Sequence, residues 1–190
     1  IDKDGNSLNS YTYILDALSQ LTTPENALVL GLGGGIIPTK LYNKGYDVDV
    51  VEIDPSTLKI AKNFFQFKKR NMNFFFEDAR TFSKSCPRKY NLIIIDLFFA
   101  DGIPEHLTTV EFYRDLRNCL NKKGVIVSNS VGDFSNSNTL NSVLFTFNAI
   151  FKDVYYFYDK PYIQQSPIKV TNLYILATNN KDIFNSKIRV

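Results

Sequence analysis

Residues 27–35 read ALVLGLGGG, an apolar run that breaks into a glycine-rich turn. A second apolar run ends in VEID at residues 51–54, so Glu52 lies 21 positions after Gly31. The first stretch predicts a strand, a tight turn and the start of a helix, and the second predicts a neighbouring strand that ends in a carboxylate. Glycine lets the backbone approach a ligand, and a carboxylate at this spacing can bind ribose hydroxyls. The two stretches therefore predict a domain that binds a nucleotide-like cofactor.

The rest of the chain alternates further strands with helices. Apolar periodicity and turn residues predict helices at about 8–20, 35–44, 55–66, 108–120 and 139–150, and strands at about 26–31, 47–53, 72–76, 92–95, 123–129, 154–158 and 170–177. The last two strands have no helix between them, so we expect an antiparallel pair. A dinucleotide-binding fingerprint would need glycine at position 36, where the sequence has Ile36.

The predicted fold is α/β, with a single domain over residues 1–190. It is a Rossmann-like, doubly wound seven-stranded sheet of the class I S-adenosylmethionine-dependent methyltransferase type. The sheet is expected to be mostly parallel, with an antiparallel C-terminal strand. In sheets of this kind, ligands bind at the carboxyl ends of the strands.

Composition is that of an ordinary globular domain, with 44% hydrophobic and 22% charged residues. The net charge of +3 is spread along the chain, so no basic stripe indicates nucleic acid. No apolar stretch approaches the ~18 residues that span a bilayer, and no signal-peptide pattern is present, so we expect no membrane contact by this chain. The chain opens with Ile1 rather than Met, and its natural N-terminus is therefore expected to lie upstream.

The two cysteines, Cys86 and Cys119, have neither CxxC spacing nor a cluster of partner residues. We therefore expect free, buried thiols, which suit a protein of the reducing cytoplasm. No group of His, Cys and acidic residues has the spacing of a metal site, and this predicts that no metal is bound.

Besides Glu52, acidic residues follow three predicted strand ends. Asp54, directly before Pro55, is explained by a helix cap. Asp78 follows the strand at 72–76, and it either accepts a hydrogen bond from an adenine amino group or caps the next helix; the two roles are compatible. Asp96 ends the apolar run at 92–95, where desolvation would raise its pKa and make it a better base.

The loop after Asp96 carries Asp101, Glu105 and His106, the only histidine of the chain. These residues either line an acceptor site or belong to a polar surface loop. His106 is also explained by packing before the next helix, which begins at the TTVE capping box of residues 108–111. Leu107 and Phe112 stand at the staple positions of that box.

With these residues placed, the chain resembles the spermidine synthase (polyamine aminopropyltransferase) family, and in particular its divergent bacterial spermidine synthase-like members. The resemblance runs from about residue 27 to 129, with weaker similarity to about 177. It rests on VLGLGGG at 29–35, VEIDP at 51–55, EDAR at 77–80, and ID at 95–96 through DGIPEHLTT at 101–109. Many methyltransferases share the first three motifs, so the last segment is the most specific.

The resemblance implies transfer of an aminopropyl group from decarboxylated S-adenosylmethionine to a di- or polyamine such as putrescine, by a protein that is usually a homodimer. Asp96 would take a proton from the attacking amine, and Asp101 and Glu105 would bind the cationic acceptor. Glu52 would hold the ribose hydroxyls and Asp78 the adenine. The co-substrate would contact the residues around these strand ends, namely Gly31, Gly33, Gly34, Gly35, Glu52, Ile53, Asp78, Ala79 and Asp96.

The sequence also departs from the family pattern. The acidic residue usual in the glycine turn is replaced by Gly34, and the two acids after the fourth strand, Asp96 and Asp101, are five positions apart rather than three. The family's N-terminal β-hairpin domain is absent from this chain, and its Tyr-His pair before the first strand has no match, with only Tyr11 and Tyr13 nearby.

These departures support two alternatives. Gly34 is compatible with a methyltransferase that uses intact S-adenosylmethionine, because no acid would repel the carboxylate of that cofactor. The missing parts that cover the substrate are compatible with a non-catalytic module that binds an adenosine ligand. The sequence does not decide between them.

Overall fold

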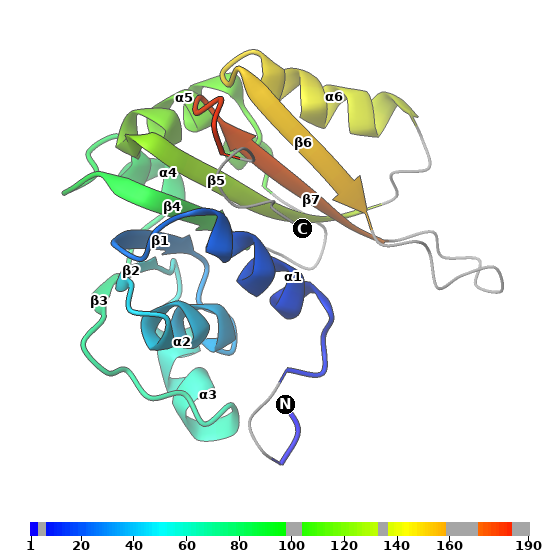
Figure 1. Ribbon diagram of the computed structural model, residues 1–190. Coiled ribbons are helices and arrows are strands. Elements are labelled where there is room, and N and C mark those ends of the chain that lie inside the picture. Colours follow the sequence, from blue (N-terminus) through cyan, green and yellow to red (C-terminus); the bar gives the residue numbers. More distant parts are fainter. Residues whose placement is uncertain (4–6, 98–103, 133–136, 159–170, 184–190) are drawn as a thin grey trace, which may run out of the picture.

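The computed structural model describes residues 1–3, 7–97, 104–132, 137–158 and 171–183 (Figure 1). Within these ranges, one seven-stranded sheet has the order β3-β2-β1-β4-β5-β7-β6. β1 to β5 are parallel, and β7 runs antiparallel to both β5 and β6. The strands are β1 (Asn26–Leu30), β2 (Asp47–Val51), β3 (Asn73–Phe75), β4 (Tyr90–Ile95), β5 (Leu120–Gly132), β6 (Asp153–Tyr158) and β7 (Thr171–Thr178). The predicted mixed sheet is confirmed, with β7 inside the sheet and β6 at its edge.

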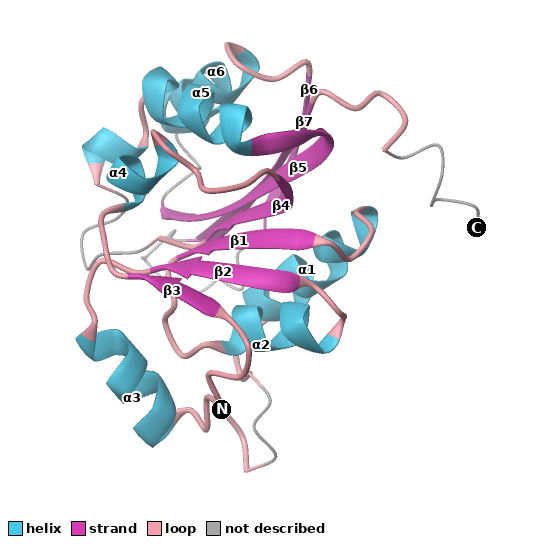
Figure 2. Cartoon of the chain, turned by 90° about the vertical axis from the view of Figure 1, so that its left-hand side faces the viewer, coloured by secondary structure: helices cyan, strands magenta, loops and turns pink. Residues whose placement is uncertain are grey.

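Helices cover both faces of the sheet, with α1 and α2 on one side and α4, α5 and α6 on the other (Figures 1 and 2). None of the helices in the described part of the chain is long and apolar enough to cross a membrane. The helical elements are α1 (Tyr11–Leu18), η1 (Ser19–Leu21), α2 (Ile36–Asn43), α3 (Ser56–Phe64), α4 (Ala79–Ser83), η2 (Glu105–Leu107), α5 (Val110–Cys119) and α6 (Ser137–Asn148).

The central strands are apolar along their whole length because they serve two cores. Leu28 and Leu30 of β1 lie in the core beneath α4, α5 and α6, whereas Ala27 and Val29 lie in the core beneath α1 and α2. Successive side chains of a strand point to opposite faces, so both sets must be apolar when both faces are covered. Because β1 to β4 are parallel, their carboxyl ends lie along one edge of this covered sheet.

The start of α5 lies one residue later than the capping-box pattern predicts. Thr109 is the capping residue, since its Oγ1 accepts a hydrogen bond from the Phe112 amide at 3.3 Å. Thr108 instead donates its hydroxyl to the Glu105 carbonyl at 2.8 Å, at the end of η2. The sequence did not indicate this turn of 3₁₀-helix, whose last residue directly precedes Thr108. Leu107 and Phe112 nevertheless lie in the same buried cluster.

The expectation of two free thiols is wrong. Cys86, which follows α4, and Cys119, the last residue of α5, form a disulfide, and their Cα atoms lie 5.8 Å apart. The two cysteines are 33 positions apart in the sequence. They meet only because α4 and α5 pack against each other, which residue spacing does not reveal. The argument from free thiols to a cytoplasmic protein therefore no longer holds.

Candidate functional site

A cavity of about 270 Å³ lies at the carboxyl ends of β1 to β4, where sheets of this type bind their ligands. Each of these strands contributes the residues that follow it, and α1 and η2 complete the walls. The lining residues are Tyr11, Gly31, Gly33, Val51, Glu52, Ile53, Thr57, Glu77, Asp78, Ala79, Asp96, Leu97, His106 and Leu107. The predicted residues Glu52, Asp78 and Asp96 therefore face one shared space.

Two glycines of the turn after β1 line this cavity. Gly31 has a φ of +96°, and a Cβ at this position would overlap the backbone oxygen of Asp96. Gly33 has a φ of +49°, and no atom lies within 4 Å of the place where its Cβ would be. Gly31 thus lets the ends of β1 and β4 approach each other. The absence of a side chain at Gly33 leaves space at this side of the cavity.

The other two glycines of the turn lie away from the cavity. A Cβ at Gly34 would come within 2.7 Å of the Phe65 ring, and one at Gly35 would overlap the Phe67 ring. Neither residue is among those that line the cavity. Close packing against these aromatic rings therefore accounts for both glycines, and their contact with a cofactor stays a prediction.

Glu52 is held by backbone amides on both sides. Its Oε2 accepts a hydrogen bond from Leu32 N at 3.0 Å, and its Oε1 accepts one from Asp54 N at 3.0 Å. Each carboxylate oxygen has a second lone pair, so this fixed group can still accept hydrogen bonds from a diol. Ile53 lies beside it at the rim, half-exposed, and offers apolar surface to a flat ligand.

Asp78 both caps α4 and faces the cavity. Its Oδ1 accepts hydrogen bonds from Arg80 N at 2.9 Å and Thr81 N at 3.1 Å, while its Oδ2 lies 3.1 Å from Nε2 of His106. Partial burial opposes ionisation, but these hydrogen bonds outweigh it and hold the pKa of Asp78 below its ordinary value. The carboxylate therefore stays ionised at neutral pH and can accept a further hydrogen bond.

Asp96 is the most strongly perturbed acid in the cavity. Asn129 Nδ2 donates to its Oδ1 at 3.1 Å, and the Tyr11 hydroxyl donates a second hydrogen bond. Burial raises the pKa of Asp96 to about 6, although both hydrogen bonds act in the opposite direction. A carboxyl group with this pKa is ionised at neutral pH, yet it holds a proton more strongly than an ordinary aspartate.

Two residues that contact Asp96 were not predicted from the sequence. Tyr11 reaches Asp96 only because α1 packs against the sheet. Asn129 is fully buried in β5, where a polar residue within the run VIVSNS was the available signal. His106, which the sequence also explains by packing before a helix, lines the cavity opposite Asp78.

Asp54 and Glu105 do not join the site. Asp54 accepts hydrogen bonds from Ser56 N at 2.8 Å and Ser56 Oγ at 2.6 Å, which confirms its role as a helix cap. Glu105 is exposed on η2 and does not line the cavity. Asp101 lies outside the described residues, so its predicted contact with an acceptor is not placed.

The cavity has a strongly negative lining. Its charged residues are Glu52, Glu77, Asp78 and Asp96, and no Lys or Arg is found among the described residues that line it. Within the described ranges, no three His, Cys, Asp or Glu side chains gather as a metal site. The arrangement is therefore suited to a cation that also carries hydrogen-bond donors.

Replacing Tyr11 with Phe is expected to shift the pH profile of any reaction that Asp96 serves as base. The hydroxyl donates to the ionised carboxylate, so its loss raises the pKa of Asp96 and moves the profile to higher pH. Loss of a hydrogen bond worth roughly 1 kcal/mol shifts the profile by about 0.7 pH unit, so we expect the rate to fall about fivefold at pH 5 and less than about twofold at pH 7. Tyr13→Phe, on the same helix but outside the cavity, is the matched control. Identical pH profiles for the two variants would contradict this role.

A doubly wound sheet with a glycine turn after β1 and acids after the next strands defines a domain of the S-adenosylmethionine-dependent transferase fold. The family model of the spermine/spermidine synthase domain matches residues 9–186. The chain therefore belongs to the spermine/spermidine synthase family. It is 36% identical, over 141 residues, to a polyamine aminopropyltransferase of Vibrio vulnificus, and the match covers 70% of this chain and 46% of that protein.

This chain is also similar to a methyltransferase and to a solved spermidine synthase structure. An N-terminal histidine N-methyltransferase of Emericella nidulans is 35% identical over 162 residues, covering 83% of this chain and 28% of that protein. A crystal structure of spermidine synthase in complex with the transition state analogue AdoDATO has the same fold, with a TM-score of 0.73 over 92% of this chain and 60% of that chain, at 16% identity. The chain spans about half the length of the curated aminopropyltransferases that it matches.

Proposed function

We propose that this domain binds decarboxylated S-adenosylmethionine and transfers its aminopropyl group to a di- or polyamine such as putrescine. The observation that carries the proposal is the charge of the cavity, which has four acidic residues and no Lys or Arg among the described lining residues. The decarboxylated cofactor is a dication with a sulfonium and an ammonium group, whereas the intact cofactor adds a carboxylate. Carboxylate walls attract the first and repel the added group of the second.

The cavity offers a partner for each part of such a nucleoside. Glu52, fixed by two amides, accepts hydrogen bonds from the ribose hydroxyls. Asp78 presents its Oδ2 to the amino group of adenine, because its Oδ1 already caps α4. Ile53, Ala79 and Leu107 supply apolar surface for the ring.

Asp96 then acts on the acceptor amine. An alkylammonium resembles Lys, with a pKa of about 10.4, so the nucleophile reaches the site mostly protonated. The carboxylate attracts this cation and accepts a proton from it. The nitrogen lone pair then attacks the methylene carbon next to the sulfonium, the carbon–sulfur bond breaks, and methylthioadenosine leaves. Raising the pKa of Asp96 to about 6 narrows the gap in proton affinity between base and amine.

Calorimetric titration with the two cofactors tests the proposal. Decarboxylated S-adenosylmethionine is expected to bind at least about tenfold more tightly than the intact cofactor, because like charges in one cavity cost over 1 kcal/mol. Addition of putrescine should then release methylthioadenosine. Tighter binding of the intact cofactor would contradict aminopropyl transfer.

A methyltransferase that uses intact S-adenosylmethionine is the second candidate. It is favoured by the similarity to a histidine N-methyltransferase. Methyl transfer to an amine in the titrated sample would identify it. Binding of methylthioadenosine without turnover of any amine would instead indicate a non-catalytic module.

Several expectations about the whole protein stay proposals. A homodimer, a cytoplasmic location and activity without a metal are the properties that we infer for it. Sedimentation of the purified protein, localisation of a tagged copy and assay in the presence of a chelator test these three in turn.

A further inference from the structure

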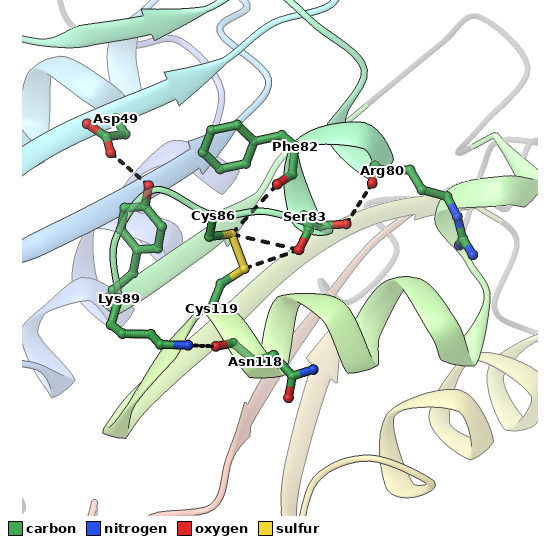
Figure 3. Close-up of a disulfide and its surroundings, with 9 residues drawn as sticks. Asp49, Arg80, Phe82, Ser83, Cys86, Lys89, Asn118 and Cys119 are labelled. Carbon is green, nitrogen blue, oxygen red and sulfur yellow. Dashed lines mark hydrogen bonds between the residues drawn. A yellow bond between two sulfur atoms is a disulfide. The ribbon is translucent and has the colours of Figure 1, made fainter.

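The disulfide joins two helices at the ends that lie away from the cavity. Cys86 lies three residues after the end of α4 at Ser83, and Cys119 is the last residue of α5 (Figure 3). Cys119 is 2% exposed, whereas Cys86 is partly exposed. Cys86 is therefore the more accessible of the two cysteines to a thiolate from solution, while Cys119 is shielded.

The same two helices begin at the cavity, where polar contacts join them. Arg80 of α4 donates to the hydroxyl of Thr109, the capping residue of α5, at 2.6 Å and to the carbonyl of His106 at 2.9 Å. The side chain of His106 lies 3.1 Å from Asp78, the capping residue of α4. The two helices are thus connected at both ends, covalently at one and by hydrogen bonds at the other.

These connections hold one wall of the nucleoside cavity. The lining residues Asp78 and Ala79 lie at the start of α4, and His106 and Leu107 lie just before α5. α4 has only five residues, too few for a helix to be stable without tertiary contacts. Its position depends on Phe82, which packs against Phe75, and on the disulfide. Loss of the covalent link therefore removes one of the attachments that orient Asp78.

In the reduced state, each thiol would lie close to a backbone carbonyl oxygen. The Sγ of Cys119 lies 3.4 Å from the carbonyl oxygen of Ser83, and the Sγ of Cys86 lies 3.9 Å from that of Phe82 (Figure 3). A thiol at either position can donate to these oxygens. Both cysteine side chains are thus accommodated in both states, as a reversible exchange requires.

We propose that Cys86 and Cys119 form a thiol–disulfide exchange site whose redox state sets the affinity of the cavity for its nucleoside. A thiolate of an external dithiol attacks Cys86 Sγ, the disulfide bond breaks, and Cys119 leaves as a thiolate that takes up a proton. The second thiol of the reductant resolves the mixed disulfide and releases Cys86, so two electrons pass to the protein. This inference rests on the proposed function, in which the cavity binds a nucleoside, and adds that the redox state of the two cysteines regulates this binding.

The test compares oxidised and dithiothreitol-treated protein under conditions where far-ultraviolet circular dichroism shows both to be folded. Thiol titration should rise from 0 to about 2 per chain on reduction, as the exchange requires. Calorimetry with methylthioadenosine should show a dissociation constant about fivefold or more higher in the reduced state, the usual lower range of coupling between sites. Amide hydrogen exchange at Arg80 and Thr81, which Asp78 caps, should quicken without any ligand.

The double variant Cys86→Ala/Cys119→Ala is the control. It should bind methylthioadenosine like the reduced protein, and dithiothreitol should not change its affinity. Equal dissociation constants in both redox states, or two free thiols before reduction, would overturn the inference. Lack of binding in both states would count against the proposed function, whereas unchanged exchange at Arg80 and Thr81 would count against the coupling itself.

Discussion

Asp96→Asn is expected to lower the rate of methylthioadenosine release by about 10²- to 10⁴-fold, the usual contribution of a general base. Asparagine has the shape of aspartate, and its amide oxygen can still accept the hydrogen bond that Asn129 donates. It cannot accept a proton from the amine. Nucleoside affinity should change little, because Glu52 and Asp78 remain in place. A rate within threefold of that of the original protein would exclude Asp96 as the base.

The same substitution should stabilise the fold at neutral pH. The pKa of Asp96 rises from its ordinary value of 3.8 to about 6 in the folded protein. The ionised form is therefore disfavoured by folding, and this penalty is absent below about pH 4 and complete above about pH 6. Asparagine removes a cost of up to about 3 kcal/mol. An inactive variant with a raised urea midpoint at pH 7, and an unchanged one at pH 4, would show that lost activity is not lost folding.

The pH dependence of the proposed reaction, measured on the original protein, provides a further check on Asp96. Below about pH 6 the carboxyl is protonated and cannot act as base, so kcat/KM should rise with pH through this region. Asp54→Asn is the matched control, since Asp54 is exposed, caps α3 and does not line the cavity. The control should keep both the rate and the pH profile. Loss of activity in the control comparable to that of Asp96→Asn would contradict the assignment.

The sequence predicts the parts of this protein that depend on local patterns. Strands covered on both faces are continuous apolar runs, and parallel strands bring the residues that follow them to one edge. Glu52, Asp78 and Asp96 could therefore be placed together without a structure. Their hydrogen-bond partners are supplied by packing. Tyr11 depends on where α1 lies, and Asn129 depends on which neighbour β5 has in the sheet.

Glycine-rich turns illustrate a second limit of sequence analysis. Four glycines within five residues predict close approach of the backbone to something, but not to what. Gly31 and Gly33 line the cavity, whereas Gly34 and Gly35 face the rings of Phe65 and Phe67. Both uses require the absence of a Cβ, so the sequence signal is the same. Only the path of the chain after α3 separates a ligand contact from a packing contact.

The disulfide also could not be predicted from the spacing of its two cysteines. Its removal is the second change for which we expect a large effect. Cys86→Ala/Cys119→Ala should lower the free energy of unfolding by about 4 kcal/mol, because the crosslink closes a loop of roughly 34 residues in the unfolded chain. For a domain of this size, the melting temperature should fall by roughly 10 °C. Urea unfolding with and without dithiothreitol measures the effect. The reduced original protein should unfold like the double variant, since both lack the crosslink.

The comparison also separates a structural crosslink from a pair of neighbouring thiols. Mutation alone removes packing as well as the bond, because Cys119 is buried. Reduction removes the bond and keeps both sulfur atoms. A stability loss shared by the reduced protein and the variant is therefore due to the crosslink, whereas a loss confined to the variant is due to packing. Equal stability of oxidised and reduced protein would contradict the disulfide as a source of stability.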